Sequence, residues 1–122
     1  MKYEISVSSH NTYLHVLVNQ PVTAELLKDF ISETAKKSKE CRIDNFLFDL
    51  RHAHNQANLS THYEMVYNES PKLGFKPQSK HALLVSPKDW DDYRFVETIL
   101  MNASYRSMIF TEEKSAIEWL EL

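Results

Sequence analysis

The chain has 122 residues and a mass of 14.3 kDa, with 43% hydrophobic residues, 25% charged residues and a formal net charge of −3. This length predicts one domain, residues 1–122, with enough core to fold without a disulfide or a metal. The single glycine, Gly74, excludes the P-loop and the dinucleotide-binding fingerprint, and the single cysteine, Cys41, excludes an internal disulfide and a multi-cysteine zinc site. A pI near 6.0 disfavours nucleic acid as a partner.

The first part of the chain shows no targeting or membrane signal. Glu4 lies where a signal peptide would carry only positive charge. The stretch 5–24 is uncharged and long enough to cross a membrane, but its serines, histidines, asparagines and proline do not suit hydrocarbon. We therefore expect a cytoplasmic protein with no membrane span.

The hydrophobic pattern of the first half predicts two strands, a helix and a third strand. In chain order these are strands at 3–7 and 14–18, a helix from Thr23 to about Lys39, and a strand at 43–50. The last of these contains the continuous apolar block Phe46-Leu47-Phe48, which is typical of a strand covered on both faces.

The second half alternates between helices and strands after a polar loop, 51–58. Thr61 and Glu64 have the spacing of a capping box, and Pro71 is expected to end the helix that they begin. The later elements are a strand at 82–85, a helix at 89–103, a strand at 108–110 and a helix at 111–120. This order predicts an α/β fold, in which about four helices pack against a mixed, largely parallel five-stranded sheet.

Three features of the chain resemble the SpoIIAA-like family, small and mostly uncharacterised bacterial proteins with a STAS-type fold. They are the paired N-terminal strands, the segment 46–51 (FLFDLR) that runs into a polar loop, and the C-terminal segment 110–120 (FTEEKSAIEWL). The resemblance covers essentially the whole chain and implies a non-enzymatic binding or signalling module. In related anti-sigma-factor antagonists, a serine at the start of the helix after the central strand is phosphorylated. Ser60 and Thr61 occupy that position here, and other relatives of the fold resemble lipid-carrying domains, which implies an apolar ligand.

A first candidate site lies in the loop and helix start at 51–61. Ligands of open α/β sheets bind beyond the carboxyl ends of the parallel strands. Two helix starts there are acidic, at 89–92 and at 112–113, whereas the helix near Ser60 has no acid before Glu64. We predict that an anionic group or a protein partner docks at this edge, on Arg51, His52, His54, Ser60, Thr61 and His62. The alternative is that Arg51 pairs with an acid and the histidines are solvated.

A second candidate is the surplus of aromatic residues on two helices, Tyr63, Tyr67, Trp90 and Tyr93. They exceed what one apolar helix stripe needs. They predict either a homodimer contact, which we favour, or a pocket for a small apolar or amphipathic ligand. The alternative is that the rings lie at the edge of the core with their polar tips in water.

Catalysis is the third and least favoured reading. His52, His54 and His62 could ligate zinc, and Ser60, His62 and Asp49 could form a hydrolase triad. Ser60 and His62 lie too close in sequence to face each other on a helix, and no carboxylate has metal-ligand spacing. We therefore expect no enzyme activity, no metal and no cofactor.

Overall fold

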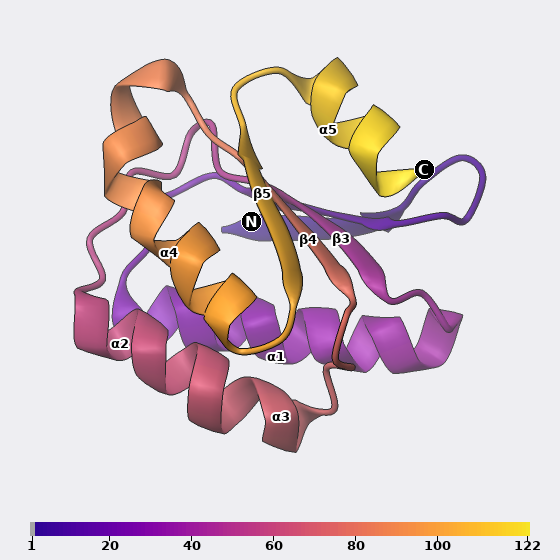
Figure 1. Cartoon of the computed structure of the whole chain (residues 1–122), viewed down its shortest axis with the longest axis horizontal. Helices are drawn as coiled ribbons and strands as arrows, with labels where there is room; N and C mark the ends of the chain where they lie inside the picture. Colours follow the sequence, from indigo (N-terminus) through magenta and orange to yellow (C-terminus); the bar gives the residue numbers. More distant parts are fainter. Residues whose placement is uncertain (1) are drawn as a thin grey trace.

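The chain folds around a five-stranded sheet whose strands lie side by side in sequence order (Figure 1). The structure is a computed structural model, which describes residues 2–122. The strands are β1 (Tyr3–Val7), β2 (Leu14–Val18), β3 (Asn45–Asp49), β4 (Lys80–Leu84) and β5 (Arg106–Phe110). β1 is antiparallel to β2, and every later pair is parallel. The expected mixed, largely parallel sheet is confirmed.

The helices cover the two faces of the sheet unequally. They are α1 (Ala24–Cys41), α2 (Leu59–Glu64), the π-helix η1 (Met65–Glu69), α3 (Ser70–Leu73), the 3₁₀ turn η2 (Pro87–Asp89), α4 (Trp90–Asn102) and α5 (Glu113–Leu120). Figure 1 shows α5 alone on one side of the sheet, and α1, α2, α3 and α4 on the other. Crossovers that share one hand and advance in one direction along a sheet place their helices on one face, and α5, which follows the last strand, is free to cover the other.

Side-chain alternation along the strands divides the interior into two cores. In β3, Phe46 and Phe48 join the large core beneath α1, η1 and α4, whereas Leu47 joins a smaller core with Ala116 and Leu120 of α5. Both faces of the strand are therefore covered, as the continuous apolar block predicts.

The helix after β3 differs from the prediction at both ends. Its N-cap is Asn58, whose side-chain oxygen accepts from the Thr61 backbone N–H at 2.9 Å, so Thr61 and Glu64 do not form the capping box. The helix also continues through Pro71 to Gly74, which caps it in the left-handed conformation at φ 94°.

Pro71 explains why the middle of this helix is π-helical. In an α-helix, the proline ring would clash with the carbonyl four residues earlier, that of Tyr67. The chain instead widens over Met65–Glu69, and the Ser70 N–H donates to the Met65 carbonyl five residues back. Single π turns of this kind are frequent at functional sites.

Candidate functional site

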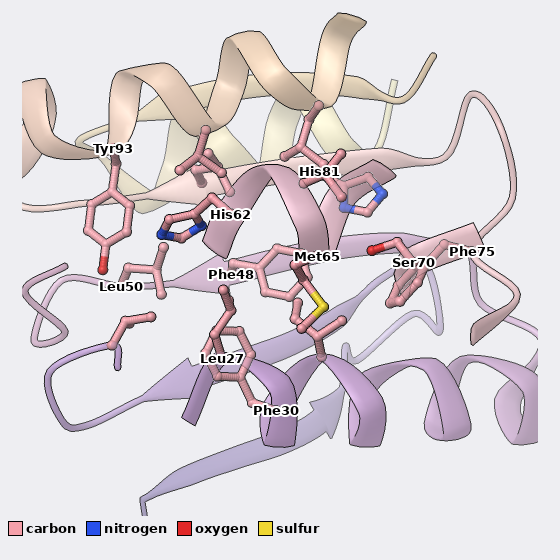
Figure 2. A pocket seen from close by; sticks show the side chains of 16 residues that line it. Leu27, Phe30, Phe48, Leu50, His62, Met65, Ser70, Phe75, His81 and Tyr93 are labelled. Carbon is pink, nitrogen blue, oxygen red and sulfur yellow. The ribbon is translucent and has the colours of Figure 1, made fainter. Parts of the chain in front are cut away.

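A small cavity of about 60 Å³ lies between the large helical layer and the sheet (Figure 2). Its walls come from α1, β3, β4, α4 and the α2–η1–α3 helix, and every lining residue except Ile31 is buried. Most of the lining is aliphatic or aromatic, with four polar side chains: His62, Ser70, His81 and Tyr93. No Asp, Glu, Lys or Arg of residues 2–122 lines the cavity. The cavity is therefore apolar, with isolated neutral polar groups.

His62 is one of these polar groups and lies on α2. Its Nε2 donates to Asn55 Oδ1 at 2.9 Å, and its ring meets Phe95 edge-on at 5.4 Å. Asn55 Oδ1 is an acceptor here because its Nδ2 donates to the Ala57 carbonyl. Burial lowers the pKa of His62 to about 4, so the ring is neutral at pH 7. A neutral His62 does not supply the positive charge expected of an anion site.

His81, on β4, is the second buried imidazole of the cavity. The rings of Phe46, Phe48, Phe75 and Tyr105 surround it at centroid distances of 5.0–5.9 Å. Its Nε2 lies 3.0 Å from Ser79 Oγ, and burial lowers its pKa to about 3. Sequence reasoning did not select His81, although a histidine inside an apolar strand, KHALLV, is a signal for a buried ring.

Tyr93 is the one of the four predicted pocket aromatics that lines the cavity. Its hydroxyl donates to the Ala53 carbonyl, and burial raises its pKa above the ordinary value. Tyr63 is 53% exposed and stacks on Tyr67 at 4.4 Å, while Trp90 lies against Arg94. Tyr67 and Trp90 are partly buried at the edge of the large core, so none of these three rings lines the cavity, and a homodimer contact through them stays a prediction.

Arg51 does not offer a free cation, which corrects the predicted anion site. Its guanidinium donates twice to Asp49, at 2.9 and 2.7 Å, and once to Glu113 at 3.2 Å. Asp49 is buried and also lies 3.0 Å from His15 Nε2. Burial alone would raise the pKa of Asp49, but the hydrogen bonds from Arg51 and His15 outweigh it and hold the pKa well below its usual range. Glu113 lies 62 positions from Arg51 in the sequence, so no local sequence pattern indicates that the two residues pair.

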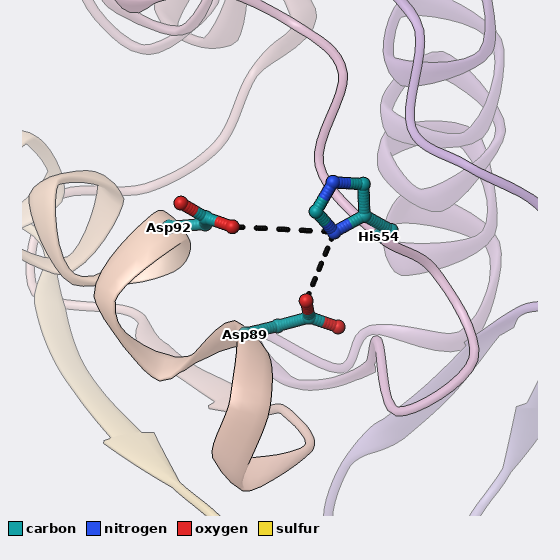
Figure 3. A group of neighbouring side chains, drawn as sticks. All are labelled: His54, Asp89 and Asp92. Atoms are coloured by element: carbon teal, nitrogen blue, oxygen red, sulfur yellow. Dashed lines mark hydrogen bonds and ion pairs between the residues drawn. The ribbon is translucent and has the colours of Figure 1, made fainter.

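The loop 51–58 is fastened at several points. The Val22 N–H donates to the His54 carbonyl, and the Gln56 N–H donates to the Val22 carbonyl, both at 2.9 Å. His54 Nδ1 lies 2.9 Å from Asp89 Oδ1 and 4.0 Å from Asp92 Oδ2 (Figure 3). One ligand atom from each of these three residues lies within 4.8 Å of the others, an arrangement that could hold a cation. The direct hydrogen bond between His54 and Asp89 is sufficient to explain why these three side chains lie close together.

The remaining predicted residues do not converge. His52 is exposed, His54 is hydrogen-bonded to Asp89 of η2, and His62 faces the interior, so the three histidines do not form the zinc site considered from the sequence. Ser60 is exposed and donates to Asn58 Oδ1 at 3.1 Å. Ser60 and Thr61 line a surface groove between α1 and α2, and their phosphorylation stays a prediction.

The comparisons with known proteins concern the fold. No protein-family model and no curated protein matches the chain. One similar solved structure is the crystal structure of an uncharacterised protein of the DUF3478 family with a SpoIIAA-like fold, from Shewanella loihica. It has a TM-score of 0.58 and 18% sequence identity, covering 97% of this chain and 91% of that chain. Within residues 2–122, no helix is apolar enough over a sufficient length to cross a membrane. The chain has the SpoIIAA-like fold that its sequence resembles.

Proposed function

We propose that the protein binds a small, uncharged and mainly apolar molecule in the cavity under its helical layer. The observation that supports this proposal is the apolar cavity, lined almost entirely by buried residues, whose two imidazoles are neutral. An ionised ligand would lie there without a charged partner, and an unpaired buried charge is strongly unfavourable. An uncharged ring or short alkyl chain meets no such cost.

The cavity must widen to hold such a ligand. At about 60 Å³ it is smaller than the engineered cavity of about 150 Å³ that accepts benzene, and far below pockets for larger ligands. Its wall includes Met65 and Val66 of the π-helical segment. A methionine side chain adapts its shape easily, and the π-helix already departs from regular hydrogen bonding. This wall is where expansion is expected.

We infer a binding module without catalytic activity of its own. The two imidazoles at the cavity pair with Asn55 and Ser79, not with a carboxylate that would make either one a general base. Asp49, which would have been the acid of the predicted triad, faces the opposite side of the sheet and is paired with Arg51. A carrier or a ligand-responsive regulator fits this arrangement.

Toluene binding measured by NMR tests the proposal. Toluene is expected to shift the methyl signals of Val66, Leu83 and Val96, which line the cavity. Val96→Leu places one more methylene in the same space and is expected to weaken toluene binding about tenfold or more. Val7→Leu makes the same chemical change outside the lining and is the matched control. Absence of binding to the unaltered protein, or equal binding by both variants, would contradict the proposal.

A further inference from the structure

The cavity lies directly behind a surface groove, and a single side chain belongs to both. The groove, of about 560 Å³, is formed by Ala24 and Lys28 of α1 together with Ser60, Thr61 and Glu64 of α2 and Met65 and Glu69 of η1. Met65 also lines the cavity and is 7% exposed. Its side chain is therefore the partition between the inner space and the groove, and Figure 2 shows it on the cavity side.

The Met65 side chain and the π-helical backbone that carries it can both change conformation at a low cost in free energy. Methionine has three rotatable bonds and tolerates several packing arrangements. Its backbone carbonyl accepts the wide hydrogen bond from Ser70 that begins the π segment, and Pro71 supplies no N–H to bond back into this turn. Rotation of Met65 would join the cavity to the groove without breaking a strand or unwinding α1.

The two compartments have different chemistry. The cavity offers apolar walls and no charged side chain from residues 2–122. The groove offers the hydroxyls of Ser60 and Thr61, the ammonium of Lys28, and the carboxylates of Glu64 and Glu69. Glu64 already accepts from Asn68 at 2.6 Å, and Glu69 lies 4.0 Å from Lys72, so both carboxylates have a partner, and Lys28 adds a positive charge to the same groove. Such a surface supplies hydrogen-bond donors and acceptors without strong selection for one charge.

We propose that the ligand is amphipathic: its apolar end, a ring or short chain, fills the cavity, and a neutral polar end such as a hydroxyl lies in the groove after Met65 moves aside. This inference rests on the proposed function and adds the access route and the chemical class of the ligand. A wholly enclosed ligand, by contrast, could place its polar end only against the few polar side chains of the cavity, which are His62, Ser70, His81 and Tyr93.

A pair of matched compounds tests the chemical class on the unaltered protein. n-Propylbenzene and 3-phenylpropan-1-ol differ by one hydroxyl at the end of the same tail. If the hydroxyl reaches the groove, the two dissociation constants agree within about threefold; if the hydroxyl is enclosed and unpaired, the alcohol binds at least about tenfold more weakly. The second result would overturn the inference and leave the proposed function intact. Failure of both compounds to bind would contradict the proposed function itself.

A pair of variants tests the route. Met65→Ala and Val96→Ala both remove side-chain volume from the cavity wall, but Val96 lies on α4 and does not line the groove. We expect bound n-propylbenzene to exchange at least about tenfold faster in Met65→Ala than in Val96→Ala, measured by NMR line shape and exchange spectroscopy. Met65→Leu, which retains most of the side-chain volume, should stay near the unaltered rate. Equal acceleration in both alanine variants would overturn the route, and the compound comparison stands if Met65→Ala fails to fold.

Discussion

The two faces of the sheet bury ionisable groups in opposite ways. Under α1, η1 and α4, the buried groups are the neutral imidazoles of His62 and His81, surrounded by apolar side chains. Under α5, the buried Asp49 is paired with Arg51 and His15. Among residues 2–122, the cavity on the helical face is thus lined by uncharged side chains, whereas the α5 face buries the ion pair of Asp49 and Arg51.

The difference follows from how much apolar surface each layer can bury. The eight-residue α5 contributes only Ala116 and Leu120 as buried residues, so charged contacts assist it at both ends. Arg51 reaches Glu113 at its start, and the Lys80 ammonium donates to the Trp119 carbonyl at 2.8 Å at its end. The other layer has a large core and does not depend on ion pairs. This contrast agrees with the proposed ligand site on the helical face, where the cavity lining carries no charge.

Removing the Asp49 carboxylate is the strongest test of this contrast. Asp49→Ala leaves Arg51 and His15 without their buried partner, so we expect the free energy of unfolding to fall by about 3 kcal/mol in urea titrations at pH 7. Glu113→Gln removes a half-exposed partner of the same arginine and should cost less than about 1 kcal/mol. Equal losses in the two variants would mean that burial does not distinguish these carboxylates.

Acid should weaken the two faces in different pH ranges. His62 and His81 have folded-state pKa values of about 4 and about 3, below the ordinary value of 6.5, so the unfolded chain binds protons first as the pH falls. Each histidine therefore lowers stability by about 1.4 kcal/mol per pH unit below pH 6.5, or about 2 kcal/mol at pH 5. The pKa of Asp49 is also depressed, so its contribution is present above the unfolded carboxyl pKa and is lost only as the pH falls below it.

Two variants separate these pH ranges. His81→Gln keeps a side chain that can pair with Ser79 but takes up no proton. Between pH 6.5 and pH 5, the free energy of unfolding of this variant should therefore fall less steeply than that of the unaltered protein, by about 1.4 kcal/mol per pH unit. The Asp49→Ala variant should instead lose the fall in stability below about pH 4. An unchanged slope in His81→Gln would show that this ring is not held neutral.

Packing should respond differently on the two faces. Val96→Leu adds a methylene beside the cavity and is expected to change stability by less than about 0.5 kcal/mol, since space is available. Ala82→Val adds side-chain volume to the α5 core, where Ala82 is fully buried, and should cost about 1.5 kcal/mol. Thermal and urea unfolding measure both changes. A larger loss in Val96→Leu than in Ala82→Val would contradict the assignment of free space to the helical face.

The sequence was most informative where the signal is local. The run Phe46-Leu47-Phe48 predicts a two-sided strand, and Thr23 predicts the start of α1, where its hydroxyl accepts from the Leu26 N–H at 3.2 Å. Pro71 misled because helices usually end near a proline, whereas here a π turn relieves the clash. The spacing of apolar residues along the chain does not indicate this π turn.

The candidate site was less predictable because its residues are distant in sequence and come together only in the folded chain. The Arg51–Glu113 pair joins distant segments, and the Asp49 side chain that neutralises Arg51 looks from the sequence like an ordinary strand-end acid. His81 and Met65 acquire their roles only when α1, η1 and β4 enclose the same space. Spacing along one helix cannot indicate such a cavity.

A small effect is also expected at the His54–Asp89 hydrogen bond, which is open to solvent on one side. His54 is 55% exposed although its partner Asp89 is buried, and Ser86 Oγ also donates to Asp89, at 3.2 Å. His54→Ala should therefore lower stability by at most about 1 kcal/mol, because water can replace the imidazole, in contrast to the loss expected at Asp49. Zinc should leave the Tm of the unaltered protein and of the variant unchanged if the His54–Asp89–Asp92 group serves only to hold the loop. A zinc-dependent rise in Tm that disappears in His54→Ala would instead identify a metal site at this edge. The molecule would then have a second binding position besides the cavity proposed for the ligand.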